Sequence, residues 1–154
     1  MTVERLILLA DSDIEVARRL ARVARSEGFE VITAKKGLEV IPMAVTSQPS
    51  LIVLDVVFPD ADGRDLLKEI RLDPRVADIP VLMWSERDYE SDRLIALELG
   101  AQDYLRKSPP ALLLPRIARI LNNKPRVAAA NPEGAAVPSR GGDDPRCGLI
   151  ERRP

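Results

Sequence analysis

Polar residues that follow four short apolar runs are the part of this sequence best suited to chemistry. The runs and the residues after them are 6–10 before Asp11-Ser12-Asp13, 51–54 before Asp55, 81–84 before Ser85, and 104–105 two residues before Lys107. Parallel neighbouring strands end at one sheet edge, where open α/β sheets bind ligands. Two or three carboxylates, a hydroxyl and an amine would then converge, which suits chemistry on phosphate with a divalent cation.

The composition indicates one soluble globular domain with a short appendage. The chain has 154 residues, of which 45% are hydrophobic and 31% charged. Its formal net charge of -1 predicts no broad surface for nucleic acid. The residues before Asp11 are too few for a secretory signal or a membrane span, so we expect a cytoplasmic protein without membrane insertion. The single cysteine, Cys147, excludes an intramolecular disulfide.

The sequence contains no histidine, and this absence removes several kinds of chemistry together. Ser-His-Asp and Cys-His catalysis are excluded, as are zinc sites built on imidazole. A phosphorylated histidine in this chain is excluded as well. Any phosphoryl group transferred through a histidine must therefore come from another protein.

The elements that must position the polar residues alternate regularly between apolar runs and stretches of helical periodicity. This alternation predicts βαβ units with a parallel sheet, arranged as a three-layer α/β sandwich of five strands and five helices. Proline at position 42 predicts a kink or a short first turn in the second helix. Asp62 is expected to cap the third helix. The predicted strands cover 6–10, 29–33, 50–54, 80–84 and 102–105, and the helices follow Asp11, then cover 37–46, 63–72 and 89–99, and end near 122.

The pattern ends after residue 122, which divides the chain into a domain over 1–122 and a tail over 123–154. Proline, glycine, alanine and charged residues dominate the tail without an apolar stripe, so we expect it to be disordered. Leu149-Ile150, flanked by arginines, leaves open a short docking peptide. The simpler interpretation is an untethered tail.

Each polar residue at the predicted edge also has a purely structural interpretation. Asp11 could cap the first helix, and Ser12 with Glu15 forms the S-x-x-E pattern of a capping box. Ser85 could be a loop hydroxyl and Lys107 a solvated surface lysine. Four independent polar strand ends at one edge nevertheless favour a common cause.

At these motifs the chain resembles the receiver domain of two-component response regulators, over about residues 5–122. The resemblance implies a doubly wound sheet in the flavodoxin-like order 2-1-3-4-5. It also implies a signalling protein rather than an enzyme, with its output through protein contacts. The motifs are Leu8-Leu9-Ala10-Asp11-Ser12-Asp13, Leu51-Ile52-Val53-Leu54-Asp55 with Pro59 and Asp62-Gly63, residues 78–85, and residues 99–107.

The resemblance also implies a role for each site residue. Asp55 would accept a phosphoryl group from a phosphohistidine of a histidine kinase or phosphotransfer protein. Ser85 and Lys107 would contact that group, and Tyr104 would be the aromatic residue of the switch. Mg²⁺ would be held by Asp11, Asp55 and the backbone carbonyl of Val57, with Ser12 or Asp13 as a further candidate ligand.

Four residues depart from the pattern of the family. Ser12 replaces the second acid, so we expect weaker Mg²⁺ binding. Ser108 separates Lys107 from Pro109, which predicts a trans peptide after the lysine. Glu86 stands where a small residue is usual and would repel an anionic phosphodonor. Val57 cannot orient a hydrolytic water, which predicts a long-lived acyl phosphate.

Three functions remain distinguishable at this point. The first is a phosphorylation-dependent switch with no output domain after Asn122, acting on a downstream target that the sequence does not identify. The second is a pseudo-receiver, a binding module that acts without phosphorylation. The third is a phosphatase of the haloacid dehalogenase type, in which Asp11-Ser12-Asp13 would supply the D-x-D motif. That enzyme needs a further acidic pair after Lys107, and the following serine and prolines offer none.

Overall fold

The computed structural model describes residues 5–87 and 89–122, so the predicted tail at 123–154 lies outside the described residues. Strands and helices alternate through the whole of this region, as the periodicity predicts. No helix among the described residues is long and apolar enough to cross a membrane. The elements are β1 (Leu6–Ala10), α1 (Ile14–Ser26), β2 (Glu30–Ala34), α2 (Gly37–Ser47), β3 (Leu51–Leu54), α3 (Gly63–Leu72), β4 (Val81–Ser85), α4 (Glu90–Glu98), β5 (Asp103–Arg106) and α5 (Pro110–Asn122).

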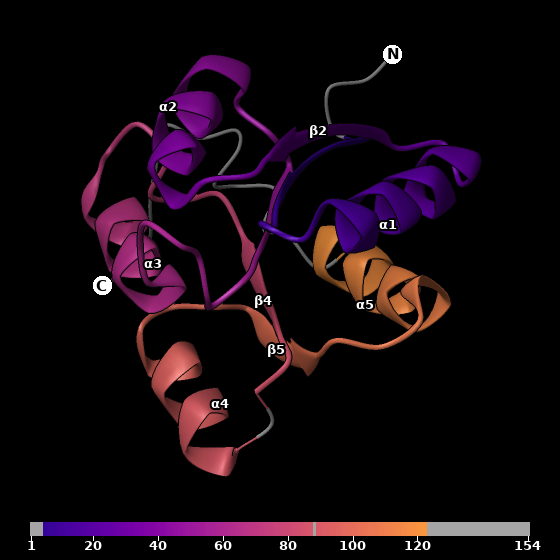
Figure 1. Cartoon of the computed structure of the whole chain (residues 1–154). Coiled ribbons are helices and arrows are strands. Elements are labelled where there is room, and N and C mark those ends of the chain that lie inside the picture. The colour runs from indigo at the N-terminus through magenta and orange to yellow at the C-terminus, as the bar shows by residue number, and fades with distance from the viewer. Residues whose placement is uncertain (1–4, 88, 123–154) are drawn as a thin grey trace, which may run out of the picture. The chain divides into compact units, whose positions relative to one another are not determined.

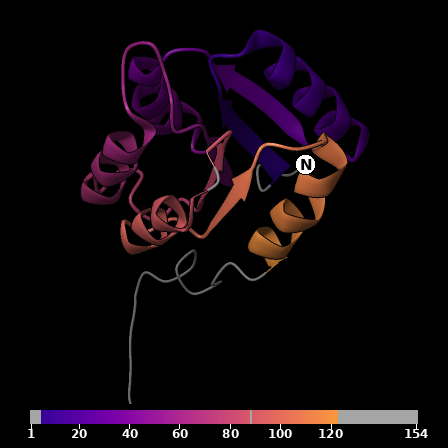
Figure 2. The ribbon, with the colours of Figure 1, turned by 60° about the horizontal axis from the view of Figure 1, so that its bottom comes forward.

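The five strands form one parallel sheet in the order β2-β1-β3-β4-β5, which confirms the predicted doubly wound α/β fold. Helices α1 and α5 cover one face, and α2, α3 and α4 cover the other (Figure 1). Figure 2 shows helices on both sides of the sheet in a second orientation. Because the order reverses between β1 and β3, the carboxyl ends of these two strands flank the switch point where ligands bind in such sheets.

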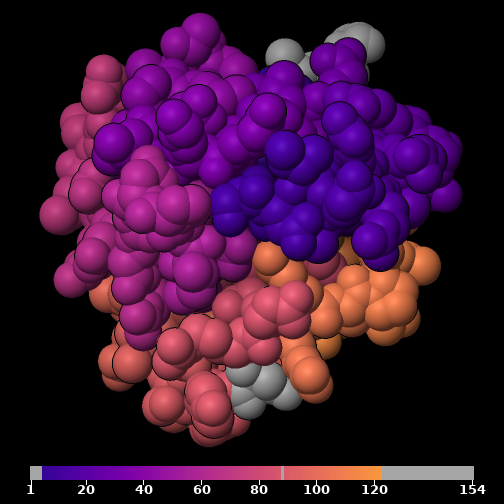
Figure 3. All heavy atoms as spheres, in the orientation of Figure 1, coloured from indigo at the N-terminus to yellow at the C-terminus, as the bar shows by residue number. Residues whose placement is uncertain are grey.

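The hydrophobic core lies in two layers, one on each face of the sheet. All four residues of β3 and all five of β4 are buried, as expected for central strands covered on both faces. On one face, Leu20 of α1 and Leu113 of α5 belong to the same cluster. The surfaces of α1 (indigo) and α5 (orange) meet in the space-filling view (Figure 3). This packing fixes the strand ends that carry the polar residues.

Two local expectations need correction or refinement. The capping-box prediction for Ser12 is wrong, because Asp13 is the N-cap of α1 and its carboxylate accepts from the N–H groups of Glu15 and Val16 at 3.0 and 3.2 Å. An aspartate one residue later caps the helix with a full negative charge, which also favours the helix dipole. In α2 the helix continues through Pro42 as a single element.

Candidate functional site

Asp11 and Asp55 lie side by side at the carboxyl edge of the sheet. Each follows its strand directly, and β1 and β3 are paired so that Ala10 lies opposite Leu54. The Asp55 N–H donates to the Ala10 carbonyl at 2.9 Å, so the backbone hydrogen bonds between β1 and β3 continue as far as Asp55. Asp11 is fully buried and Asp55 is 5% exposed. The structure therefore brings two carboxylates together in a site largely closed to water.

Lys107 reaches these carboxylates from the end of β5. Its backbone N–H donates to the Ser85 carbonyl at 2.7 Å, which fixes the start of the side chain beside β4. Its Nζ lies 2.8 Å from Asp11 Oδ2 and 3.0 Å from Asp55 Oδ2. The described residues contain no cis peptide bond, so the bonds on both sides of Ser108 are trans. The peptide bond after Lys107 is thus trans, as expected, and the lysine still contacts both carboxylates.

The three charged groups change one another's protonation. Burial raises the pKa of the Asp55 carboxyl, and repulsion from Asp11 adds to that increase, while the hydrogen bond and charge of Lys107 act in the opposite direction. Burial alone would lower the pKa of the Lys107 ammonium, but the two carboxylates outweigh it and raise this pKa. The lysine is therefore charged at neutral pH, and two carboxylates share a single cation.

The segment after Asp55 is held by close backbone packing. Asp55 Oδ1 accepts from the N–H groups of Val56 and Val57 at 2.7 and 3.3 Å. Gly63 donates to the Val56 carbonyl at 2.6 Å, and a Cβ at position 63 would lie 2.0 Å from the Asp55 carbonyl oxygen. Only glycine permits this approach. Asp62 caps α3 as predicted, accepting from the Arg64 N–H at 2.8 Å.

Ser85 and Tyr104 are connected through the backbone of Arg87. Ser85 is fully buried, and its Oγ accepts from the Arg87 N–H at 3.0 Å. Tyr104 is also buried, and its hydroxyl donates to the Arg87 carbonyl at 2.9 Å. Burial raises the pKa of the Tyr104 hydroxyl, which keeps it a neutral donor. The backbone of Arg87 is therefore held by hydrogen bonds to both side chains.

An ion-pair network that the sequence analysis missed extends from the same residue. The guanidinium of Arg87 donates to both carboxylate oxygens of Asp92 in α4, at 3.0 and 3.2 Å. Asp92 is 4% exposed and also lies 3.7 Å from the Arg64 guanidinium, which pairs with Asp62 at 2.8 Å. An acid in the first turn of a helix is common because it complements the helix dipole, so the sequence offered no separate signal for this network.

The remaining candidate residues contribute less to the site. The Asp13 side chain caps α1, so the D-x-D pair of a phosphatase does not form here. Ser12 is half-buried, and Glu86 is exposed at a shallow hollow shared with Arg87, Tyr89 and Arg106. No group of three or more acidic, histidine or cysteine residues among the described residues could hold a metal ion.

A Mg²⁺ ion nevertheless fits part of this donor set. Asp11 and Asp55 offer carboxylate oxygens, which Mg²⁺ prefers, and Asp11 Oδ2 is a buried acceptor that, within the described part of the chain, faces the cation of Lys107. The Val57 backbone lies beside the Asp55 carboxylate. Mg²⁺ is commonly held by one or two carboxylates together with waters, and Asp11 and Asp55 would supply these carboxylates. The missing third acid lowers the charge offered to the ion.

The fold and the site define the class of protein: a doubly wound parallel sheet with two buried acids and a lysine at its switch point. Residues 7–118 match the family described as the response regulator receiver domain. The chain belongs to this family, whose members act mainly in signalling. This confirms the resemblance drawn from the motifs.

The chain is similar to curated transcriptional regulators and to solved receiver domains. It is 40% identical over 118 residues to the transcriptional regulatory protein GltR of Pseudomonas aeruginosa, covering 76% of this chain and 49% of that protein. It is 36% identical over 128 residues to the alkaline phosphatase synthesis transcriptional regulatory protein PhoP of Bacillus subtilis, covering 82% of this chain and 52% of that protein. The chain thus spans about half the length of these relatives.

Among solved structures, the BeF3-activated receiver domain of Klebsiella pneumoniae RstA is 27% identical with a TM-score of 0.70, covering 77% of this chain and 99% of that one. The receiver domain of the Francisella response regulator 1452 is 26% identical with a TM-score of 0.73, covering 79% and 99%. Both likenesses extend over nearly the whole of the solved chains. They agree with the observed strand order.

Proposed function

We propose that this domain is a phosphorylation-dependent switch in which Asp55 accepts a phosphoryl group from the phosphohistidine of a partner kinase or phosphotransfer protein. The observation that carries the proposal is the pairing of Asp55 and Asp11 with the single ammonium of Lys107, at 3.0 and 2.8 Å. A carboxylate so placed is partly desolvated and already faces a cation. An entering phosphoryl group would find the same cation.

The transfer step would use the Asp55 carboxylate as nucleophile and the donor imidazole as leaving group. A carboxylate oxygen of Asp55 attacks the phosphorus, the bond between phosphorus and the donor imidazole nitrogen breaks, and the imidazole takes up a proton. Lys107 balances the charge on the phosphoryl oxygens. Mg²⁺, held by Asp11, Asp55 and the Val57 carbonyl, would neutralise the remaining negative charge.

The switch would read the acyl phosphate through Ser85. Its oxygen accepts from the Arg87 N–H, and its O–H would donate to a phosphoryl oxygen on Asp55, a contact that exists only after phosphorylation. Because Tyr104 donates to the Arg87 carbonyl, a shift of Ser85 alters the support of the aromatic ring. The signal would then pass to a downstream protein through the surface of the domain near Tyr104 of β5.

Labelling with acetyl phosphate in the presence of Mg²⁺ tests the proposal. We expect a mass increase of one phosphoryl group that maps to the peptide containing Asp55 and disappears in Asp55→Asn. The matched control is Asp60→Asn, which removes an acid from the same loop; Asp60 accepts from the N–H groups of Gly37 and Leu38 instead. Label that survives in Asp55→Asn would contradict the assignment.

A pseudo-receiver is the second candidate, and Ser12 in place of an acid is the observation that favours it. With fewer charges for Mg²⁺, the site could act as a fixed ion triad that only holds the fold. In that case neither acetyl phosphate nor a kinase would label the wild-type chain, while Ser12→Asp would restore labelling. A labelled wild-type chain excludes this candidate.

A further inference from the structure

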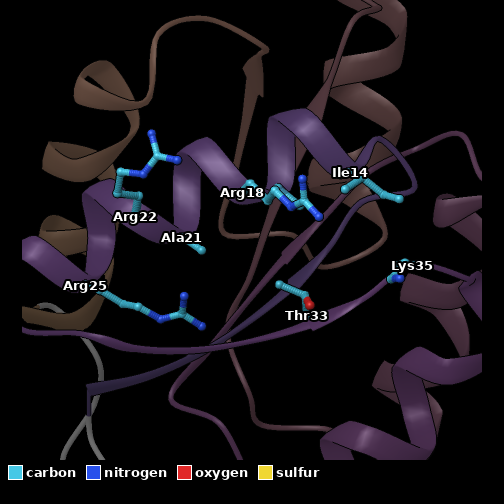
Figure 4. Close-up of a pocket in the computed structure, with 8 residues that line it drawn as sticks. Ile14, Arg18, Ala21, Arg22, Arg25, Thr33 and Lys35 are labelled. Carbon is cyan, nitrogen blue, oxygen red and sulfur yellow. The ribbon is translucent and has the colours of Figure 1, made fainter.

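A positively charged groove lies between α1 and the edge strand β2. Its volume is about 470 Å³. Figure 4 shows the side chains that line it, with Ala21 and Arg25 extending from the helix and Thr33 from the strand. Small residues of α1 leave this space open beside the helix. The lining consists of Ile14, Ala17, Arg18, Ala21, Arg22, Arg25, Thr33 and Lys35.

The cations along this groove have few acidic partners. Arg18 lies 3.7 Å from Glu15, with both side chains exposed, and the Glu39 carboxylate accepts from the backbone N–H of Lys35 at 3.0 Å. Arg25 donates to the Val31 carbonyl at 2.9 Å, and neither Arg22 nor Lys35 has an ion pair among the described residues. Like charges three and four residues apart destabilise a helix, so helix stability does not account for this row. Their concentration on a chain of net charge -1 points to an anionic ligand.

The other wall of the groove is the edge of the sheet. Among the described strands, β2 is the first of the sheet and pairs only with β1, and just after it the Lys35 N–H is already taken by Glu39. The Ala34 carbonyl accepts from the Asp11 N–H, so it faces β1, and alternation along the strand directs the Thr33 N–H and carbonyl outward. The outward Val31 carbonyl is taken by Arg25. Position 33 therefore offers backbone groups for pairing with a further strand.

We propose that this groove binds an acidic polypeptide segment in an extended conformation, which adds to the edge of β2 and places its carboxylates against the arginines of α1. The row from Arg18 to Arg25 is about 10 Å long at the rise of an α-helix. Side chains on one face of an extended peptide repeat every ~6.7 Å, so two or three acidic residues match the row. Arginine binds carboxylates in a bidentate manner, and backbone pairing supplies orientation.

A nucleic acid fits this groove less well. Single-stranded nucleic acids are bound by basic grooves that also carry aromatic side chains for base stacking. None of the described residues that line the groove is aromatic. A strand edge also has no complementary partner in a sugar-phosphate backbone. The observations therefore favour a peptide over a polynucleotide.

Fluorescence anisotropy with the full chain tests the proposal, using a short synthetic peptide in which glutamate alternates with valine and threonine. We expect Arg22→Glu to weaken binding by about tenfold. The matched control is Arg19→Glu, which makes the same charge change on α1 outside the groove and should change binding by less than about twofold. Thr33→Pro removes the outward N–H and should also weaken binding by about tenfold, since proline is tolerated at a strand edge. Circular dichroism confirms that each variant is folded.

Three results would overturn the proposal. Equal losses in Arg19→Glu and Arg22→Glu would mean diffuse electrostatic attraction rather than a groove. Unchanged binding in folded Thr33→Pro would exclude strand addition. A single-stranded oligonucleotide that binds as tightly as the peptide would show a general polyanion surface. Each readout is independent of phosphorylation at Asp55.

Discussion

Replacement of Lys107 by methionine tests whether the ion triad holds the site together. The change keeps most of the apolar stem and removes the ammonium that lies within 3.0 Å of both Asp11 and Asp55. Each contact, at 2.8 and 3.0 Å, corresponds to about 5–6 kcal/mol of gross Coulomb attraction at an effective dielectric constant of about 20. Desolvation of the buried ammonium offsets much of this attraction. Removing one partner of a buried ion pair costs about 3–5 kcal/mol, and we expect the free energy of unfolding to fall by this amount in Lys107→Met.

The assay is urea unfolding at neutral pH without Mg²⁺, followed by the fluorescence of Trp84, which is 1% exposed. The control is Lys68→Met, because Lys68 pairs with Asp65 at 3.8 Å on the surface and should contribute less than about 1 kcal/mol. Adding Asp55→Asn to Lys107→Met should recover most of the lost free energy of unfolding, because the unpaired charge of the Asp55 carboxylate is then removed. A loss no greater than that of Lys68→Met would refute the reasoning.

The pH dependence of the same variant has a defined sign. The pKa of Lys107 is raised in the fold, so its contribution is complete below the ordinary value of 10.5 and is lost as pH rises through the folded value. The pKa of Asp55 is also raised, so its ionisation opposes folding at neutral pH, and this cost disappears as pH falls through the folded value. The difference in the free energy of unfolding between wild type and Lys107→Met should therefore become smaller both in acid and at high pH.

Three further substitutions test other parts of the site. Ser12→Asp should tighten Mg²⁺ binding by about tenfold or more in calorimetric titration, because it adds a full charge, and an unchanged affinity would contradict this. Gly63→Ala should lower the free energy of unfolding by about 1–3 kcal/mol or more and impair labelling of Asp55, since its Cβ would meet a backbone oxygen at 2.0 Å; wild-type stability and labelling would refute the steric argument. Asp92→Asn should increase hydrogen exchange at the Arg87 amide, and unchanged protection would show that the ion pair does not hold the loop.

The sequence predicted those parts of the site that strand topology determines. Asp55, Asp11 and Lys107 each follow an apolar run, and a parallel sheet brings all run ends to one edge whatever the details of packing. The sequence likewise predicted that a helix begins at Gly63, after the cap Asp62. These features depend on residues close together in the chain or on the period of the pattern.

The contacts that the sequence did not reveal depend on side chains of separate elements. Asp60 accepts from the N–H of Gly37, 23 residues earlier, and so ties the loop after Asp55 to the start of α2. The Arg87–Asp92 pair depends on how far the loop before α4 folds back over the helix. Neither has a periodic signature. The prediction of Asp11 or Ser12 at the start of α1 missed Asp13 as its cap, because neighbouring Asp and Ser residues cap helices about equally well.

The exchange of an acid for Ser12 changes the charge balance of the whole site. Two carboxylates and one ammonium leave a single uncompensated negative charge, whereas a third acid would leave two. Repulsion in the metal-free fold is therefore smaller, and Lys107 alone neutralises much of it. The same exchange would also lower the negative charge offered to Mg²⁺, and under the proposed function the entering phosphoryl group would bring further negative charge that Lys107 cannot balance alone. Under that proposal, Ser12 would favour the metal-free fold over metal binding, and phosphorylation of Asp55 would be the step most sensitive to the supply of Mg²⁺.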